Sequence, residues 1–238
     1  MQATNAALLA HPALALDAYE RVAGEYDDAE HRTTRILENL SRRATQRAQQ
    51  QSHSRPVRTI LEIGAGTGAL TGALLGAWPE AQVIATDPSQ EMLAVLEQKH
   101  GSGDGRLATA LADVSSAFAA SDAPPDLVAA GLADPFLDPA SLRELRAGMR
   151  RGSRLLFTVP SRTWARRERI ERLGIPLGST RFRLRDGSVV FARSLTYDER
   201  DMRHLAGTAG FVVIAVGTER STELWSAPEV CWALVSAS

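Results

Sequence analysis

The sequence of 238 residues has almost no cysteine and almost no lysine. Cys231 is the single cysteine, which excludes a disulfide framework within the chain and a metal cluster built from cysteine thiolates. Lys99 is the single lysine, so arginine supplies the other 26 of the 27 basic residues, an excess that by itself identifies no partner. No charge of one sign dominates, because 28 acidic residues give a formal net charge of −1. This balance argues against a protein held on nucleic acid or on an anionic membrane by bulk electrostatics.

Long hydrophobic runs are also lacking. No apolar segment approaches the roughly 18 residues of a membrane-spanning helix. The first twenty residues, MQATNAALLAHPALALDAYE, are rich in alanine but carry no basic residue ahead of the apolar stretch, and Asp17 and Glu20 follow closely. This pattern favours a helix over an export signal. We therefore expect a soluble, cytoplasmic protein without a membrane partner.

The 44% of hydrophobic residues suffices for one domain with a sizeable core. Residues 1–55 predict a helical cap that is not an independent domain. Its main helix carries an apolar stripe at spacings of three and four, formed by Ala29, Thr33, Ile36, Leu37, Leu40 and Ala44. The polar stretch 46–54, closed by Pro56, predicts the end of this helix and a linker to the main domain, residues 56–238.

From residue 57 onward, short apolar runs alternate with helical patterns. Strands are expected over 57–63, 82–86, 106–111, 126–130 and 154–159, with helices between most of them. Because these runs are too uniformly apolar to be half exposed, they predict an α/β fold with a parallel sheet covered on both faces.

The last third predicts a different arrangement. Alternating residues around Asp186-Gly187 indicate a β-hairpin, inserted at about 178–195. A helix over 198–209 and strands over 211–216 and 229–236 follow it. The main sheet then has seven strands, with an end that is prone to antiparallel pairing.

The most informative segment is the glycine-rich turn after the first strand, which holds Gly64, Gly66 and Gly68. Such a turn brings bare backbone N–H groups close to a ligand without steric conflict from a Cβ atom. Three interpretations compete: a tight strand-to-helix connection without a ligand, a dinucleotide site, and a site for a nucleoside that carries a sulfonium. Gly64-x-Gly66-x-x-Ala69 satisfies the dinucleotide pattern.

Acidic residues at strand ends favour the third interpretation. Glu62 precedes the first glycine by two residues, where a dinucleotide loop usually has an apolar residue, and its carboxylate is expected to face a ligand's ammonium group, directly or through water. Asp113 closes the third strand and is placed to accept a hydrogen bond from an adenine amino group. Asp87, at the end of the second strand, suits the ribose hydroxyls of either ligand class and does not discriminate.

Five segments resemble, in order, the successive motifs of class I S-adenosylmethionine-dependent methyltransferases: LEIGAGTGALTGALL, VIATDPSQEML, ALADVSS, PDLVAAGLA and LRAGMRRGSRLLFTVP. The resemblance covers roughly residues 56–160, and the tail is consistent with it. It implies a Rossmann-like, seven-stranded, mostly parallel sheet with helices on both faces and an antiparallel last strand. It also implies S-adenosyl-L-methionine as the cofactor.

The resemblance further implies roles for single residues. The turn from Gly64 to Gly68, with Ala65 and Gly66 between them, would line the methionine end of the cofactor. Asp87 would bind the ribose, and Asp113 the adenine. Ala129 and Ala130 would form the floor beneath the sulfonium. An N-terminal helix with Tyr26 would cap the site, as in the small-molecule branch. The remaining expected cofactor contacts are Pro88, Met92 and Val114.

The chain departs from this family after the fourth strand, where many relatives carry a histidine and this sequence reads Gly131-Leu132-Ala133-Asp134-Pro135-Phe136. A catalytic base of the family's type is therefore in doubt. The candidate bases are His31, on the helix expected to cover the site, His204, on the late helix, and Tyr197. A structural or exposed role is the commoner one for each histidine.

Arginines crowd the stretch 162–185, which indicates either an anionic acceptor or a solvated helix with Arg167–Glu171 and Glu168–Arg172 pairs. We favour the helix, and without interleaved aromatic residues a nucleic-acid partner is not expected. The sequence thus predicts a methyltransferase acting on an oxygen, nitrogen or carbon atom of a small-molecule acceptor, and a homodimer is compatible with it. The alternatives are a relative with the same cofactor but a non-methylating reaction (a cyclisation or rearrangement), an NAD-dependent dehydrogenase, and a catalytically silent binding module.

Overall fold

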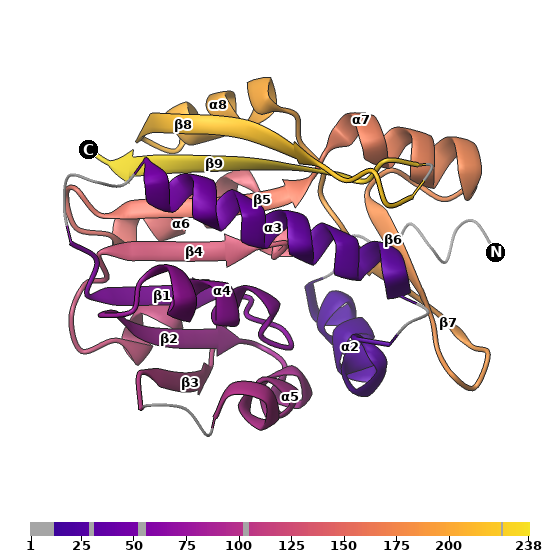
Figure 1. The fold of residues 1–238 in the computed structure, drawn as a ribbon, viewed down its shortest axis with the longest axis horizontal. Helices are drawn as coiled ribbons and strands as arrows, with labels where there is room; N and C mark the ends of the chain where they lie inside the picture. The colour runs from indigo at the N-terminus through magenta and orange to yellow at the C-terminus, as the bar shows by residue number, and fades with distance from the viewer. Residues whose placement is uncertain (1–11, 29–30, 52–55, 102–104, 225) are drawn as a thin grey trace.

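The computed structural model describes residues 12–28, 31–51, 56–101, 105–224 and 226–238. Its main sheet has seven strands in the order β3-β2-β1-β4-β5-β9-β8 (Figure 1). The strands are β1 (Thr59–Ile63), β2 (Gln82–Asp87), β3 (Leu107–Leu111), β4 (Leu127–Gly131), β5 (Arg154–Pro160), β8 (Phe211–Arg220) and β9 (Glu229–Ala237). Strands β1 to β5 pair in parallel, and β9 pairs antiparallel with both β5 and β8. The predicted seven-stranded sheet with an antiparallel last strand is therefore confirmed.

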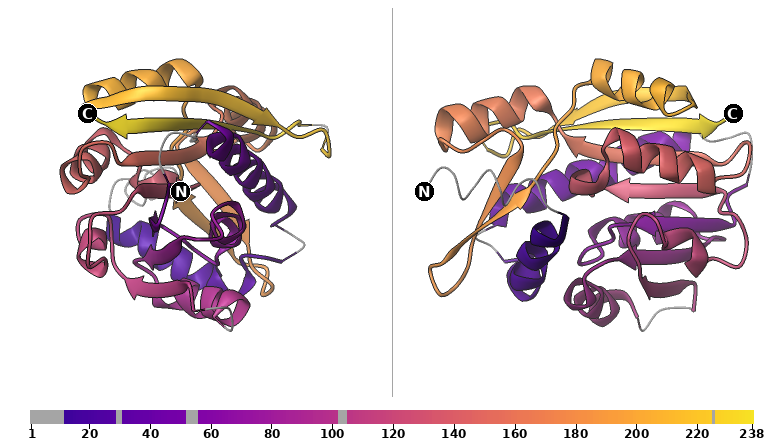
Figure 2. Two further views of the ribbon diagram at one scale, coloured as in Figure 1. Left: turned by 60° about the vertical axis from the view of Figure 1, so that its left-hand side comes forward. Right: turned by 180° about the vertical axis from the view of Figure 1, so that it is seen from behind.

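Helices cover both faces of this sheet (Figures 1 and 2). Those on one face are α3 (Arg32–Gln50), α4 (Ala69–Ala77) and α5 (Gln90–His100), and those on the other are α6 (Pro139–Gly148) and α8 (Glu199–Thr208). The side chains of successive strand residues point to opposite faces of the sheet, as the pleat requires, and form one apolar layer with the helices on each face. In β1, Ile60 packs beneath α3 and α4, whereas Leu61 packs on the side of α6 and α8.

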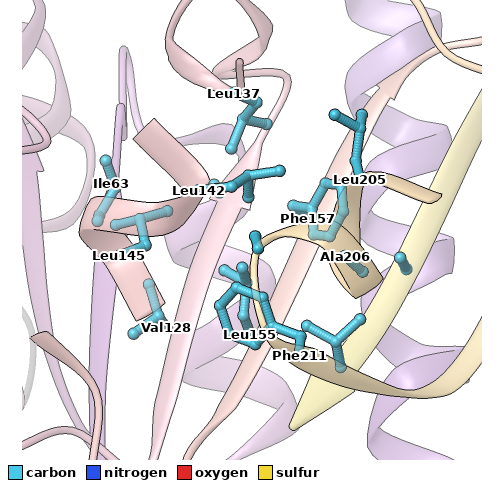
Figure 3. Close-up of a cluster of buried hydrophobic side chains, with 14 of the residues drawn as sticks. Ile63, Val128, Leu137, Leu142, Leu145, Leu155, Phe157, Leu205, Ala206 and Phe211 are labelled. Atoms are coloured by element: carbon cyan, nitrogen blue, oxygen red, sulfur yellow. The ribbon is translucent and has the colours of Figure 1, made fainter. Parts of the chain in front are cut away.

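The larger of the two layers lies between the sheet, α6 and α8 (Figure 3). Leu142 and Leu145 of α6, Leu205 of α8 and Leu155 and Phe157 of β5 all pack into it, and four of these five side chains have no exposed surface. Burial of each such side chain stabilises the fold by about 1.5–3 kcal/mol. The strand-helix alternation of the sequence thus produces a core on both faces of one rigid sheet.

Side chains at the first turns define where several helices begin. Asp138 accepts hydrogen bonds from the backbone N–H groups of Ala140 and Ser141, as the Asp138-Pro139 sequence predicts for a helix start. Asp198 and Asp201 form a reciprocal capping box at the start of α8.

A small layer lies beyond the carboxyl ends of the parallel strands (Figure 1). It contains α2 (Pro12–Val22), the short helix η1 (Ala23–Glu25) and the hairpin of β6 (Ser179–Arg183) and β7 (Val189–Arg193). The apolar side chains that join them are Ala18, Val22, Phe182, Leu184, Val190 and Ala192. The hairpin around Asp186-Gly187 is therefore present as predicted. The division into a cap over 1–55 and a main domain over 56–238 stays a prediction. The helix α3, which belongs to the predicted cap, packs directly on the main sheet.

The remaining elements connect the sheet to this small layer. They are η3 (Ala117–Ala120), η4 (Asp134–Phe136), α7 (Arg162–Ala165) and the π-helix η5 (Arg166–Arg172). The expected Glu168–Arg172 pair is present in η5, whereas Arg167 contacts Glu229 instead of Glu171. None of the described helices combines the length and the apolar character needed to cross a membrane.

Candidate functional site

The glycine turn after β1 has the backbone geometry that only glycine adopts readily. Gly64, Gly66 and Gly68 have φ angles of 64°, 55° and 87°. A Cβ on Gly64 would lie 2.6 Å from the Cβ of Ala133, and one on Gly68 would lie 2.8 Å from His100 Cδ2. A Cβ on Gly66 would meet nothing within 4 Å. Gly64 and Gly68 therefore permit close packing, whereas Gly66 presents bare backbone to open space.

That open space is a cavity of about 720 Å³, counted with its mouth, at the carboxyl ends of β1, β2 and β4. Its walls come from the glycine turn, from the segments that follow β2 and β4, from α2 and α3, and from Tyr26 just after η1. The lining residues are Leu16, Tyr19, Tyr26, Glu38, Ser41, Gly64, Ala65, Gly66, Thr67, Ala69, Leu70, Asp87, Pro88, Met92, Gly131, Leu132, Ala133, Pro135 and Phe136.

Asp87 lies on the cavity wall at the end of β2 and is 7% exposed. Its Oδ2 accepts a hydrogen bond of 2.8 Å from the Gly66 N–H, and its Oδ1 accepts one of 2.9 Å from the Ser89 N–H. Burial raises the pKa of this carboxyl, although both hydrogen bonds favour its ionised form. Asp87 thus holds the glycine turn in place and still faces the cavity, together with its neighbours Pro88 and Met92.

Glu62 does not lie on the wall. It is 1% exposed within β1, and its Oε2 accepts a hydrogen bond of 2.7 Å from the Thr71 hydroxyl of α4. Its Oε1 is buried without a hydrogen-bond partner among the described residues, and burial raises its pKa to about 8. The expectation that Glu62 faces the ligand is therefore not met, because Glu62 shares the face of β1 with Ile60 and points beneath α4.

Asp113 and Val114 also lie away from the cavity. Asp113 is exposed, and its Oδ1 accepts hydrogen bonds from the hydroxyls of Ser115 and Ser116 and from the Ser116 N–H. The hydroxyl hydrogen bonds lower the pKa of Asp113. Val114 packs in the core beneath α6. Of the three acids expected to meet in one cleft, only Asp87 does so.

The wall after β4 lies slightly further along the chain than the resemblance implies. Ala129 and Ala130 are fully buried and pack into opposite faces of the sheet. Because β4 continues to Gly131, the segment that reaches the cavity begins there and continues through Leu132 and Ala133. Leu132 has a φ of 56°, a strained value for a residue with a side chain.

A buried polar network holds this wall against the hairpin. Asp134 accepts a hydrogen bond from the Ser194 hydroxyl, and burial raises the pKa of Asp134 to about 7. Arg169 of the π-helix donates to Ser194 Oγ at 2.7 Å and to the carbonyl oxygens of Ser194 and Leu177 at 3.0 and 2.7 Å. The network thereby fixes Pro135, which follows Asp134 on the wall.

The first fifty residues contribute one expected wall residue and four that sequence reasoning missed. Tyr26 lies on the wall as expected, and Leu16, Tyr19, Glu38 and Ser41 lie there too. The available signal was a polar row beside the apolar stripe of α3, since Glu38, Ser41 and Thr45 recur at spacings of three and four and are all buried.

Glu38 differs from the other acids of the site. It is 8% exposed and has no hydrogen bond or ion pair among the described residues. Burial, helped by the nearby Asp27, raises its pKa to about 7. The cations Arg42, Lys99 and Arg35 oppose this shift only in part.

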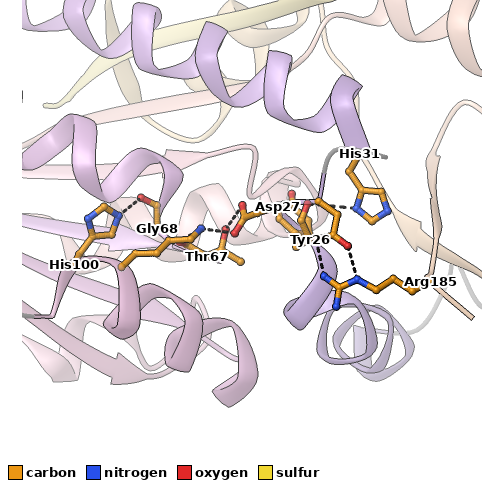
Figure 4. A network of polar contacts seen from close by, with 9 residues as sticks. Tyr26, Asp27, His31, Thr67, Gly68, His100 and Arg185 are labelled. Carbon is orange, nitrogen blue, oxygen red and sulfur yellow. Dashed lines mark hydrogen bonds and ion pairs between the residues drawn. The ribbon is translucent and has the colours of Figure 1, made fainter.

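Neither candidate histidine lies on the cavity wall. His31 Nε2 is 3.0 Å from the carbonyl oxygen of Arg183, Nδ1 is 3.3 Å from that of Tyr26, and the ring packs edge-on against Phe182. The close-up of the site shows His31 at the start of α3, between Tyr26 and the hairpin (Figure 4). His204 is exposed on α8, on the opposite face of the sheet from α3.

Polar contacts fasten the N-terminal segment over the cavity (Figure 4). Asp27 accepts a hydrogen bond of 3.0 Å from the Thr67 hydroxyl and pairs with Lys99, which also donates to the Thr67 carbonyl oxygen. Asp28 receives two hydrogen bonds of 2.8 Å from the guanidinium of Arg185 in the hairpin turn. The cap is thus joined to the glycine turn on one side and to the hairpin on the other.

Comparisons with known proteins show which proteins share this fold. Residues 60–153 match the family model described as a methyltransferase domain. No curated protein matches the chain by sequence.

Among solved structures, DhpI in complex with SAH (S-adenosylhomocysteine) is 20% identical, with 93% of this chain and 94% of DhpI covered at a TM-score of 0.58. Magnesium protoporphyrin IX methyltransferase (ChlM) from Synechocystis PCC 6803, with bound SAH, is 15% identical; the match covers 93% of this chain and 100% of ChlM at a TM-score of 0.61. A SAM-dependent methyltransferase from Methanosarcina mazei is 16% identical; the match covers 76% of this chain and 93% of that protein at a TM-score of 0.55.

Proposed function

We propose that this chain, which has the class I methyltransferase fold, is an S-adenosylmethionine-dependent enzyme that methylates an oxygen, nitrogen or carbon atom of a small molecule. The methyltransferase domain over residues 60–153 and the shared fold support the reaction class. The observation that carries the proposal is the cavity, which opens where the bare backbone of Gly66 meets the carboxylate of Asp87.

The residues present fit this cofactor. Gly66 leaves open space where any other residue would carry a side chain. Each Asp87 oxygen accepts one backbone N–H, and a carboxylate has about four acceptor sites, so Asp87 retains capacity for two ribose hydroxyls. We assign the ribose to Asp87, the base to the surface of Pro88 and Met92, and the methionyl chain to the glycine turn. The adenine contact of Asp113 stays a prediction, because its carboxylate lies in an exposed turn.

When bound, S-adenosylmethionine supplies an electrophilic methyl group on a sulfonium that is also the leaving group. The protein therefore has to orient the acceptor and exclude water. Leu132 and Phe136 provide apolar wall on the sheet side, and Tyr19 and Tyr26 provide it on the cap side. The contacts of Asp27 and Asp28 hold the cap closed over these walls.

The charge of the walls disfavours an anionic acceptor. No arginine, lysine or histidine side chain lies on the wall among the described residues, whereas Glu38 and Asp87 do. Several arginines between β5 and the hairpin have other partners: Arg162 pairs with Asp201, Arg172 with Glu168, and Arg185 with Asp28. A phosphate or carboxylate acceptor would therefore enter the cavity without a counter-ion.

Methyl-labelled S-adenosylmethionine, incubated with the full chain and a panel of small amines, phenols and carboxylates, tests the proposal. We expect label to move to an amine or a hydroxyl compound with one SAH formed per methyl group. Asp87→Ala is expected to abolish this transfer, and the matched surface variant Glu144→Gln, on the opposite face, to retain it.

Other outcomes identify the alternatives. Turnover of an acceptor while the label stays on the cofactor would assign a non-methylating reaction in the same site. Binding of NAD without binding of S-adenosylmethionine would identify the protein as a dehydrogenase. Binding of S-adenosylmethionine without turnover of any acceptor would identify it as a silent binding module.

A further inference from the structure

Glu38 of α3 is distinctive among the buried acidic side chains that the structure describes. The others each have a hydrogen bond or an ion pair to a named partner: Glu62, Asp87, Asp134, Glu168, Glu219 and Glu229. Glu38 has neither within the described ranges, although it is 8% exposed. Unlike Glu62 Oε1, which is buried without a partner, the Glu38 carboxylate remains accessible at the cavity wall, so the partner open to it is a molecule bound in the cavity.

The cations near Glu38 do not satisfy it. Lys99 is held by Asp27 and by the Thr67 carbonyl oxygen, and the exposed Arg35 and Arg42 act on Glu38 only through their charge. Tyr26, half-buried on the wall of the same cavity, carries no charge at neutral pH, because desolvation raises its pKa further. Among the residues that the structure describes, no cation therefore contacts this carboxylate.

Glu38 and Asp87 stand at different places on the cavity wall. Glu38 also lines the groove between α3, α4 and α5, together with Gly68 and Ala69 just past the glycine turn. Asp87 lines only the cavity, and it is not among the charges that act on Glu38. The wall thus has one carboxylate at the end of β2 and a second, separate one where the cavity meets the groove.

We infer that Glu38 binds the α-ammonium group in the methionyl chain of S-adenosylmethionine. This inference rests on the proposed function. The cofactor carries its ribose hydroxyls and its ammonium group on opposite sides of the sulfur, which matches two separated carboxylates on one wall. Glu62, the acid that precedes the glycine turn, is bonded to Thr71 and lies off the wall, so Glu38 takes the position that the sequence suggests for Glu62.

A pair of ligands tests this assignment without any acceptor. SAH contains the ammonium group, and 5′-methylthioadenosine has the same nucleoside and sulfur without the amino-acid part. Titration calorimetry with the full chain is expected to show that Glu38→Gln weakens SAH binding roughly 10- to 100-fold, the range for a hydrogen bond to a charged group. The affinity for 5′-methylthioadenosine is expected to stay within about twofold of the wild-type value.

Proton release gives a second measure. Because Glu38 is partly protonated near neutral pH and an ammonium partner favours its ionised form, SAH binding near pH 7 is expected to release protons. Calorimetry in buffers of different ionisation enthalpy measures this release, which Glu38→Gln is expected to reduce. The charged and titratable groups around Glu38 are Asp27, Arg35, Arg42, Lys99 and Tyr26, and all stay unchanged in the variant.

Thermal unfolding without ligand verifies that Glu38→Gln folds. The variant Glu38→Asp keeps the charge and is expected to retain part of the SAH affinity that Glu38→Gln loses. The assignment is wrong if Glu38→Gln weakens the binding of SAH and of 5′-methylthioadenosine equally. It is also wrong if the SAH affinity is unchanged while methyl transfer is slower, a result that would make Glu38 a base for the acceptor. Failure of the wild-type chain to bind either ligand contradicts the proposed function instead.

Discussion

The two glycines Gly64 and Gly66 allow one prediction to be worked through from the structure. Both have positive φ, and an alanine in this region costs about 1–2 kcal/mol. Gly66→Ala carries this cost alone, because its Cβ meets no atom within 4 Å. Gly64→Ala adds a contact of 2.6 Å with the Ala133 Cβ, and such overpacking costs about 1–3 kcal/mol more.

These costs translate into melting temperatures. For a domain of this size 1 kcal/mol corresponds to about 2–4 °C. We expect Gly66→Ala to lower the melting temperature by about 2–8 °C and Gly64→Ala by about 4–20 °C. Since the Gly66 backbone faces the cavity, Gly66→Ala is also expected to weaken SAH binding at least about tenfold, despite its milder effect on stability.

Differential scanning fluorimetry with and without SAH, followed by calorimetry, measures both effects. Gly76→Ala is the matched control: Gly76 lies in α4 with ordinary φ and open space around it, so the substitution is expected to stabilise the fold by about 0.5–1 kcal/mol and to leave binding unchanged. If Gly66→Ala binds SAH like the wild-type chain, or melts below Gly64→Ala, the reasoning about this turn is wrong.

Arg169→Met is expected to destabilise the fold by about 3–5 kcal/mol, because it removes the three hydrogen bonds that Arg169 donates to Ser194 and Leu177 and leaves their buried acceptors unpaired; denaturant unfolding near wild-type values would contradict this. The pKa values of Asp134 and Glu62 are raised to about 7 and about 8, so the folded chain holds protons that the unfolded chain has released, and stability is expected to fall as pH rises from about 4 to 8. Unfolding midpoints across that range measure the slope, which Glu62→Gln should reduce; an unchanged slope would argue against a raised pKa for Glu62. His204→Ala is expected to leave kcat unchanged because the side chain is exposed and far from the cavity wall, and a loss of turnover would restore it as a candidate base. His31→Ala is expected to lower the melting temperature because the ring is buried between Tyr26 and the hairpin.

The sheet and the glycine turn were predictable because their signals are local. A short apolar run ending in Gly64-x-Gly66-x-Gly68 predicts a strand, a turn and a helix, and the strands from β1 to β5 repeat that logic. The position of Asp87 on the wall was predictable for the same reason, since the residue at the end of a parallel strand meets the edge where the turns converge.

The orientation of side chains depends on contacts between distant segments, and there the prediction was less successful. Glu62 alternates along β1 in step with Ile60, which places it beneath α4 with Thr71 and off the cavity wall. A parity argument on β1 alone would have indicated this. Glu38 gave a weaker signal, because its importance depends on how α3 lies across the sheet, which no local pattern determines.

A structure of the full chain determined with bound SAH is the measurement that tests the central claim most directly. The account predicts ribose hydroxyls on the Asp87 carboxylate, the methionyl chain along Gly66, and the ammonium group at Glu38. Density for SAH outside this cavity, or the cavity filled by side chains from α2 and η1 with no room for a nucleoside, would contradict it.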